Sequence, residues 1–273
     1  MDIQTVTPIF FSPTGTTRKL VHAVIGGMGA RAAGEMDLTL PSVRGTEPPP
    51  ITGDAVIVAM PIYAMGIPFL VYPFLQQLKG DGKPVICMAV YGNISAGIAV
   101  QQLYRLCSKQ GFIPVGAALM IAEHSYSDSK YPVAQGRPSS EDITCAQEFG
   151  RQFAQKLKNA KTPDEAVLAP MPYNPLLYYF KQLLRYNTTR FYAQVPTLEQ
   201  DRCNHCGLCA IRCPMGAIDQ STLQVDAKAC IRCCACVKCC NKKARTLRFR
   251  LNFPASRMLN LRAGKMKQPH ICI

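Results

Sequence analysis

Residues 5–20, TVTPIFFSPTGTTRKL, join an apolar run to a short polar loop and the start of an amphipathic stretch. The run Thr7–Phe11 predicts a strand, SPTGT a turn, and the following residues a helix from about Thr16 to Met28. Hydroxyls and backbone N–H groups that converge at a helix N-terminus form an anion site. Gly15 has no side chain, so the backbone and a ligand can approach each other closely there. The loop matches neither GxGxxG nor GxxxxGK[ST], which argues against the common dinucleotide and Walker-type sites.

Strand-like and helix-like stretches alternate over the rest of the first 160 residues. Further strands are predicted at 35–40, 55–60, 85–91 and 113–121, and further helices at about 70–78, 96–110 and 140–159. Ser139 and Asp142 have the spacing of a capping box at the last helix. This alternation predicts an α/β fold, a doubly wound parallel five-stranded sheet with helices on both faces.

An uncharged stretch between Asp54 and Lys79 is long enough to span a bilayer. Three prolines and Gly66 interrupt it, so a buried parallel strand, a turn and a short helix explain it better than a membrane helix.

Ten of the 14 cysteines lie between Cys203 and Cys240. The N-terminal residues lack the basic and apolar regions of a signal peptide, so we expect a cytoplasmic protein and no disulfide framework. The cysteine block therefore predicts a metal site.

The block contains one motif twice, Cys-x2-Cys-x2-Cys-x3-Cys, and proline follows the first copy at Pro214. This is the spacing of bacterial two-cluster [4Fe–4S] ligation, in which the fourth cysteine of each run serves the other cluster. One predicted ligand set, which we call the first set, is Cys203, Cys206, Cys209 and Cys240. The second set is Cys213, Cys230, Cys233 and Cys236.

Two features leave alternatives open at the cysteine block. Paired CxxC motifs also bind structural zinc, although zinc gives no reason for two matched four-cysteine runs. Asn241 replaces the usual proline after the second run, and Cys234 and Cys239 are surplus thiols that a different register could recruit in place of Cys240.

Residues 161–200 are rich in proline and aromatic residues and predict a linker between two domains. We expect its rings to pack between the domains. The alternative is an amphipathic membrane-surface segment, LLYYFKQLLRY, with Lys181 and Arg185 on its polar side.

The phosphate-loop form S-x-T-G-x-T resembles that of the flavodoxin family, and two later loops extend the resemblance. They are PIYAMG at 61–66 and VYGN at 90–93. The resemblance implies FMN, with the phosphate at the first loop and the ring between aromatic side chains, here Tyr63 and Tyr91. The implied FMN-binding residues are Ser12, Thr14, Gly15, Thr16, Thr17, Pro61, Ile62, Tyr63, Gly66, Tyr91, Gly92 and Asn93. His124, after the fifth strand, is either a ligand contact or an exposed strand-end residue.

The whole arrangement resembles the flavodoxin–ferredoxin fusion proteins of anaerobic bacteria and archaea. Expected boundaries are 1–160 for the flavodoxin-like domain, 161–200 for the linker, 201–245 for a small α+β dicluster ferredoxin domain, and 246–273 for a basic tail. The resemblance implies an electron-transfer protein that relays low-potential electrons between a redox partner, two [4Fe–4S] clusters and FMN. An alternative is an FMN-dependent reductase of a small oxidised substrate. A nucleic-acid-binding module that uses the basic tail is a third, less favoured interpretation.

The formal net charge of +14 is concentrated in the second part of the chain: 161–273 carry 18 basic and 6 acidic residues, a net +12. Each oxidised cluster with four thiolates adds about −2, and the FMN phosphate adds about −2 more. The basic excess therefore predicts compensation of anionic cofactors and an acidic redox partner, a ferredoxin or an oxidoreductase, rather than nucleic acid. Contact with a membrane surface is a further, less favoured interpretation.

Overall fold

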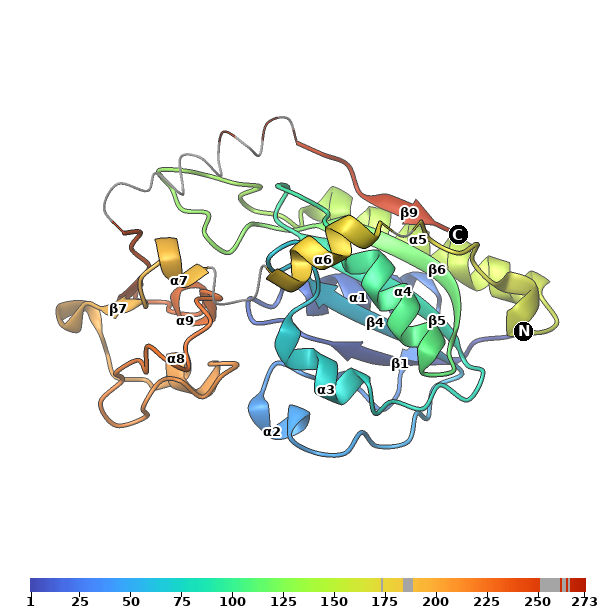
Figure 1. The fold of residues 1–273 in the computed structure, drawn as a ribbon, viewed down its shortest axis with the longest axis horizontal. Helices are drawn as coiled ribbons and strands as arrows, with labels where there is room; N and C mark the ends of the chain where they lie inside the picture. The colour runs from blue at the N-terminus through green and yellow to red at the C-terminus, as the bar shows by residue number, and fades with distance from the viewer. Residues whose placement is uncertain (173, 184–188, 251–260, 262–263, 265) are drawn as a thin grey trace.

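A computed structural model describes residues 1–172, 174–183, 189–250, 261, 264 and 266–273. Figure 1 shows a large sheet with helices on both faces and, beside it, a smaller part built from short elements around α8 and α9. The larger part holds residues 1–172 and the C-terminal strand, and the smaller part holds the two cysteine motifs.

The sheet of the larger part follows the doubly wound order β2-β1-β4-β5-β6-β9. Its parallel strands are β1 (Thr5–Phe10), β2 (Arg31–Ala32), β3 (Met36–Asp37), β4 (Ala55–Pro61), β5 (Pro84–Tyr91) and β6 (Ile113–Ile121). Both β2 and β3 pair with β1, so together they form one interrupted strand at that edge. The parallel strands thus have the 2-1-3-4-5 order of the flavodoxin-like fold, as predicted.

One strand of the sheet was not expected from the sequence. β9 (His270–Cys272) pairs antiparallel with β6, with Ala118 opposite Ile271, and so extends the five-position parallel sheet at its far edge. The three-residue segment carries no alternation long enough to reveal it. The C-terminal residues therefore return to the sheet in which the chain began.

Helices cover both faces of the sheet. α1 (Thr16–Gly27) and α5 (Ser140–Asn159) pack with each other and with one apolar cluster. The other cluster holds α3 (Tyr72–Leu75) and α4 (Ala99–Lys109), and the short α2 (Pro41–Arg44) lies near it. The expected helix at 70–78 is shorter than predicted, because a 3-10 turn (Phe69–Val71) precedes the four-residue α3.

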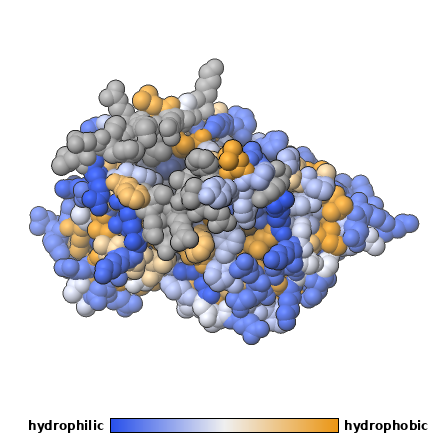
Figure 2. All heavy atoms as spheres, viewed as in Figure 1, coloured by the Kyte–Doolittle hydropathy of each residue, from blue (hydrophilic) through white to orange (hydrophobic). Residues whose placement is uncertain are grey.

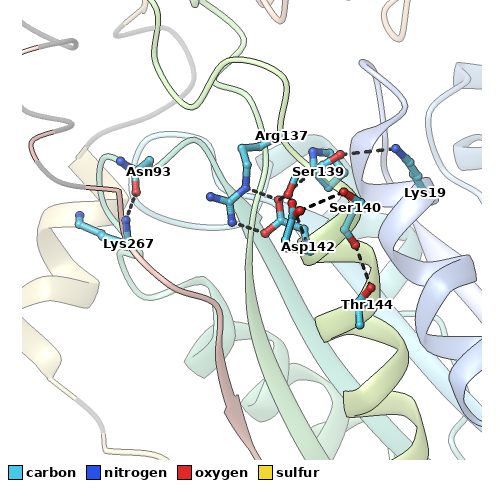
Figure 3. A network of polar contacts seen from close by, with 10 residues as sticks. Lys19, Asn93, Arg137, Ser139, Ser140, Asp142, Thr144 and Lys267 are labelled. Carbon is cyan, nitrogen blue, oxygen red and sulfur yellow. Dashed lines mark hydrogen bonds and ion pairs between the residues drawn. The ribbon is translucent and has the colours of Figure 1, made fainter.

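The predicted capping box at α5 is present. The Ser139 hydroxyl accepts from the Asp142 backbone N–H at 3.4 Å, and the Asp142 carboxylate accepts from the Ser139 backbone N–H at 2.7 Å. Arg137 pairs with the same carboxylate (Figure 3). This network begins α5 directly after the loop that leaves β6.

The contact between α1 and α5 depends on a glycine. A Cβ at Gly150 would lie 2.1 Å from the Val24 carbonyl oxygen, which is backbone and cannot rotate away. We expect Gly150→Ala to destabilise the fold by about 1–3 kcal/mol, the usual cost of overpacking. Gly26→Ala is the matched control, since nothing lies within 4 Å of its Cβ position, and it should be neutral or gain up to about 1 kcal/mol. Thermal unfolding of the two variants measures the difference; equal midpoints would contradict this packing.

No helix in the described ranges is both long and apolar enough to cross a membrane. The uncharged stretch between Asp54 and Lys79 instead forms buried β4, a loop and short α3, as its proline pattern predicted.

The smaller part contains two copies of one local structure. α8 (Leu208–Ile211) and α9 (Ala235–Lys238) each begin after a residue in the left-handed region, Gly207 at φ 71° and Cys234 at φ 62°. β7 (Thr197–Leu198) pairs antiparallel with β8 (Arg245–Thr246) and closes this part of the chain. The sequence repeat is therefore also a repeat of backbone geometry.

The linker region forms α6 (Pro175–Leu183) and α7 (Thr189–Tyr192). Its rings only partly behave as expected: Tyr192 packs edge-to-face on Tyr126 at 6.2 Å, whereas Tyr179 and Phe191 are 63% and 82% exposed. Tyr173, Arg185, Tyr186 and residues 251–260, 262, 263 and 265 of the basic tail lie outside the described residues. Figure 2 shows hydrophilic residues over much of the visible surface, with separate apolar patches among them.

Candidate functional site

A cavity lies at the carboxyl ends of the parallel strands, the edge where such sheets bind ligands. We call it the strand-end cavity. It is lined from the larger part by Pro13, Thr14, Thr16, Thr17, Pro61, Ile62, Tyr63, Ala64, Val90, Tyr91, Gly92, Ala122, Glu123, His124, Ser125 and Tyr126. The loops after β1, β4, β5 and β6 therefore meet at one place.

Eight of the twelve residues predicted for FMN line this cavity, namely Thr14, Thr16, Thr17, Pro61, Ile62, Tyr63, Tyr91 and Gly92. The other four predicted residues, Ser12, Gly15, Gly66 and Asn93, do not line the cavity. Ser12 and Gly15 shape the first loop. Gly66 pairs with Tyr63 across a tight turn. The side-chain oxygen of Asn93 accepts from the Lys267 backbone N–H at 2.9 Å (Figure 3).

The first loop leaves donors free at the start of α1. The Ser12 hydroxyl accepts from the Arg18 backbone N–H at 3.0 Å, and Gly15 turns the chain at φ 82°. Within the described part of the chain, no hydrogen bond uses the backbone N–H of Thr16 or Thr17. Thr14 and Thr16 hydroxyls lie 3.4 Å apart beside them. Hydroxyls and N–H groups at a helix N-terminus suit a phosphate.

Aromatic rings flank the other end of the cavity. Tyr63 packs edge-to-face on buried Phe11 with ring centroids 6.2 Å apart, and Tyr91 is 6% exposed. Burial raises the pKa of Tyr63 well above its usual value, so its hydroxyl stays protonated. Tyr126, in the same segment after the fifth strand as His124, packs edge-to-face on His124 and on Phe249, with ring centroids 5.4 Å and 5.7 Å apart.

His124 lies in the wall of the cavity rather than at an exposed strand end. Its Nδ1 accepts from the Tyr126 backbone N–H at 3.1 Å. Burial, and then the nearby Lys238 ammonium, lower the pKa of His124 to about 4. The ring is therefore neutral at pH 7, with its proton on Nε2. This position agrees with the first of the two sequence interpretations, and a ligand contact of His124 stays a prediction.

Five further lining residues come from outside the first 172 residues: Thr189, Tyr192, Ile231, Arg232 and Cys233. No sequence signal pointed to them, because only tertiary packing brings the second cysteine motif against the sheet edge. Cys233 belongs to the second set, so a predicted cluster ligand also lines the strand-end cavity.

Each predicted cysteine set lines its own cavity. Cys203, Cys206, Cys209 and Cys240 surround one cavity together with Lys242 and Arg245. Cys213, Cys230, Cys233 and Cys236 surround another, with Pro214 and Arg232. The structure thus brings the fourth cysteine of each run to the other motif, as the ferredoxin spacing predicts.

The sulfur environments of the two sets match in pairs. Cys203 Sγ accepts from the His205 backbone N–H, and Cys230 Sγ accepts from the Arg232 backbone N–H, both at 3.4 Å. Cys213 accepts from Ala217 at 3.2 Å and Cys240 from Ala244 at 3.3 Å. Backbone N–H groups aimed at sulfur favour the anionic thiolate.

The surplus thiols lie beside these cavities in different ways. Cys234 occupies the left-handed position that glycine takes in the first motif, and it lines the second-set cavity. The Cys239 thiol points to the Cys236 carbonyl oxygen at 3.7 Å, and it is Cys240, not Cys239, that lines the first-set cavity. Among the described residues, no three His, Cys, Asp or Glu side chains are arranged to hold a single metal ion.

The second-set cavity fits a bound cationic core. Burial raises the pKa of the Cys233 thiol to about 12 and raises that of Cys236 as well. Without a cation these sulfurs would stay protonated and could not act as metal ligands. An iron–sulfur core would supply the compensating charge, and four cysteines around one cavity are the donor set that a [4Fe–4S] core requires.

Polar and apolar contacts hold the smaller part against the strand-end cavity. Lys238 Nζ donates to the Glu123 carboxylate at 2.6 Å and to the Ser127 carbonyl oxygen at 2.9 Å. Arg44 donates to the Pro214 carbonyl oxygen, and buried Ile231 joins the apolar cluster of the sheet. The two parts therefore meet where Cys233 lines the cavity.

Comparison with known proteins agrees with this division. The family model described as "4Fe-4S binding domain" matches residues 196–219, which contain the first cysteine motif. No curated protein matches the chain.

Solved structures similar to the chain include flavodoxins and flavoproteins. A flavodoxin from the domain Archaea is 14% identical, with 57% of this chain and 99% of that one covered and a TM-score of 0.38. Rubredoxin oxygen:oxidoreductase from Desulfovibrio gigas is 18% identical, with 57% and 36% covered and a TM-score of 0.41. A flavodoxin, WrbA-like protein from Agrobacterium tumefaciens is 16% identical, with 58% and 99% covered and a TM-score of 0.39.

The strand order of the sheet defines the first part, and the family match defines the second. The chain therefore joins a domain with a flavodoxin-like fold to a ferredoxin-type 4Fe–4S domain.

Proposed function

We propose that the chain binds FMN in the strand-end cavity and two [4Fe–4S] clusters at the two cysteine sets, and relays low-potential electrons between a redox partner and the flavin. The observation that carries this proposal is Cys233, which lines both the strand-end cavity and the second-set cavity. A cluster held there would lie next to the flavin. FMN exchanges electrons singly or in pairs, whereas each cluster exchanges one at a time.

The protein's own residues position these groups. Thr14, Thr16 and Thr17 supply hydroxyls and N–H groups for the FMN phosphate. Tyr63 and Tyr91 flank the ring, and neutral His124 offers an Nε2–H donor at the same end. The contact of Lys238 with Glu123 holds the second set against this end of the cavity.

The two clusters then have different roles. The second set faces the flavin, while the first set includes Cys206, which is exposed to solvent. Because the relay needs one end open to a partner, the first set is the entry port and the second set is the internal step.

Rapid mixing of the anaerobic holoprotein with dithionite tests the relay. Iron, sulfide and FMN contents are measured first, and flavin absorbance and cluster EPR are then followed together. We expect the clusters to be reduced first and the flavin to follow with one rate that does not depend on protein concentration. Lack of FMN or iron, or flavin reduction independent of the clusters, would exclude the relay.

Steady turnover of a quinone, nitro compound or enone would show the reductase function instead.

The surface around the first set is basic and predicts an acidic redox partner. Arg202, Arg212, Lys242 and Lys243 are exposed there, and Ile211 is 59% exposed beside them. We expect the double variant Lys242→Glu/Lys243→Glu to slow association with a reduced acidic ferredoxin about tenfold at low salt.

The matched control for this variant is Lys79→Glu/Lys109→Glu. It makes the same change in net charge with exposed lysines that precede β5 and β6, at the opposite edge of the sheet. Stopped-flow rates at several ionic strengths compare the pairs. Equal slowing by both double variants would show that net charge alone causes the effect. That result would contradict an entry port at the first set.

A further inference from the structure

The two cysteine motifs present the same turn to different surroundings. The residue directly before the second cysteine of each motif has a left-handed backbone conformation. It is His205 in the first motif, with φ 54°, and Arg232 in the second, with φ 55°. Each backbone N–H donates to the first cysteine's sulfur at 3.4 Å. His205 is exposed, whereas Arg232 is 5% exposed and lines the strand-end cavity. One turn therefore meets solvent, and its copy meets the predicted flavin.

The guanidinium of Arg232 is buried, and not all of its N–H donors have an acceptor. Its Nη1 donates to the Cys230 carbonyl oxygen at 2.6 Å and to the Ala227 carbonyl oxygen at 3.3 Å. Its Nε is buried and finds no acceptor among the described residues. A buried donor left unpaired costs free energy, so a group so placed points to a missing acceptor.

Among the described residues, the charge of Arg232 also lacks a carboxylate partner. No ion pair in the described part of the chain involves it, and the nearby charged side chains include the cationic Arg190 and Arg250. A buried guanidinium is normally paired with an anion. Arg232 lines both cavities, so a bound cluster, which is anionic, and a flavin ring, which gains negative charge at N1 on reduction, would both lie within its reach.

We propose that Arg232 is a flavin-binding residue that the ferredoxin-type domain supplies across the domain interface. Its guanidinium donates to the polar edge of the ring, the carbonyl oxygens and N1, and offsets the negative charge that this edge gains on reduction. This inference rests on the proposed function, because it requires FMN in the strand-end cavity. It makes the flavin site complete only when the second motif is docked.

The test compares Arg232→Gln with Arg232→Lys and with His205→Gln, the control at the equivalent position of the first motif. Iron content and EPR establish that both clusters are present in each variant. Spectroelectrochemical titration gives the two-electron midpoint potential of bound FMN, and fluorescence quenching gives the affinity for oxidised FMN.

Loss of a charged donor should weaken the binding of reduced FMN about tenfold more than the binding of oxidised FMN. Arg232→Gln should therefore lower the flavin midpoint potential by about 30 mV. Arg232→Lys should lower it less, and His205→Gln should leave it unchanged. A shift in the cluster potential alone would overturn the proposal, because Arg232 would then serve only the cluster.

A crystal structure of the FMN-loaded wild-type protein decides the case even if Arg232→Gln fails to assemble its clusters. A guanidinium nitrogen within hydrogen-bonding distance of the ring supports the proposal, and a guanidinium turned away from the ring overturns it. Absence of FMN from the wild-type protein would instead contradict the proposed function itself.

Discussion

Replacing Cys213 with serine is expected to remove the cluster of the other motif, so that iron falls from about eight to about four atoms per chain. Cys213 lies in the first run but lines the cavity of Cys230, Cys233 and Cys236. Because that cavity adjoins the strand-end cavity, flavin reduction through the clusters should slow by at least about a hundredfold. Iron analysis, EPR and rapid mixing measure these effects.

Cys240→Ser gives the opposite pattern and is the partner experiment. It should also halve the iron content, but it removes the exposed cluster and leaves electron exchange between the second set and the flavin intact. Cys234→Ser and Cys239→Ser are the matched controls and should keep all the iron. If Cys213→Ser instead behaved like Cys203→Ser, the crossed ligand sets would be wrong.

A methyl group at Gly92 is expected to weaken FMN binding by about tenfold to a hundredfold without changing the iron content. The Cβ would lie 2.6 Å from His124 Cα and Cβ, so the loops after β5 and β6 could no longer approach each other. Overpacking of this size costs about 1–3 kcal/mol, and here it acts on two walls of the strand-end cavity.

Fluorescence titration of flavin-depleted Gly92→Ala protein measures the loss of affinity. Gly26→Ala is the control, because it adds the same methyl group in open space on α1. Unchanged FMN affinity in Gly92→Ala would show that the two loops do not jointly form the flavin site. A parallel loss of iron would show that the substitution disturbs the whole chain.

Much of the first domain could be predicted from the sequence because its signals are local. Uninterrupted apolar runs predicted β4, β5 and β6, and β6 and α5 have the expected bounds. The edge was harder to predict, because β2, β3 and β9 are two or three residues long and are defined by their partner strands. The aromatic linker likewise gave no indication that Tyr192 is covered while Phe191 is exposed.

The cysteine spacing by itself predicted iron–sulfur chemistry, because ligand spacing is a property of a short segment. The S-x-T-G-x-T loop by itself predicted only an anion site, and it indicated FMN through its resemblance to the flavodoxin family. Only the tertiary structure decided that the second motif, not the first, meets the sheet edge. The two motifs have matching backbones, and their difference lies in side chains such as His205 and Arg232 and in distant contacts such as Lys238 with Glu123. Packing between segments more than a hundred residues apart decides which turn faces the strand-end cavity, and no local pattern records it.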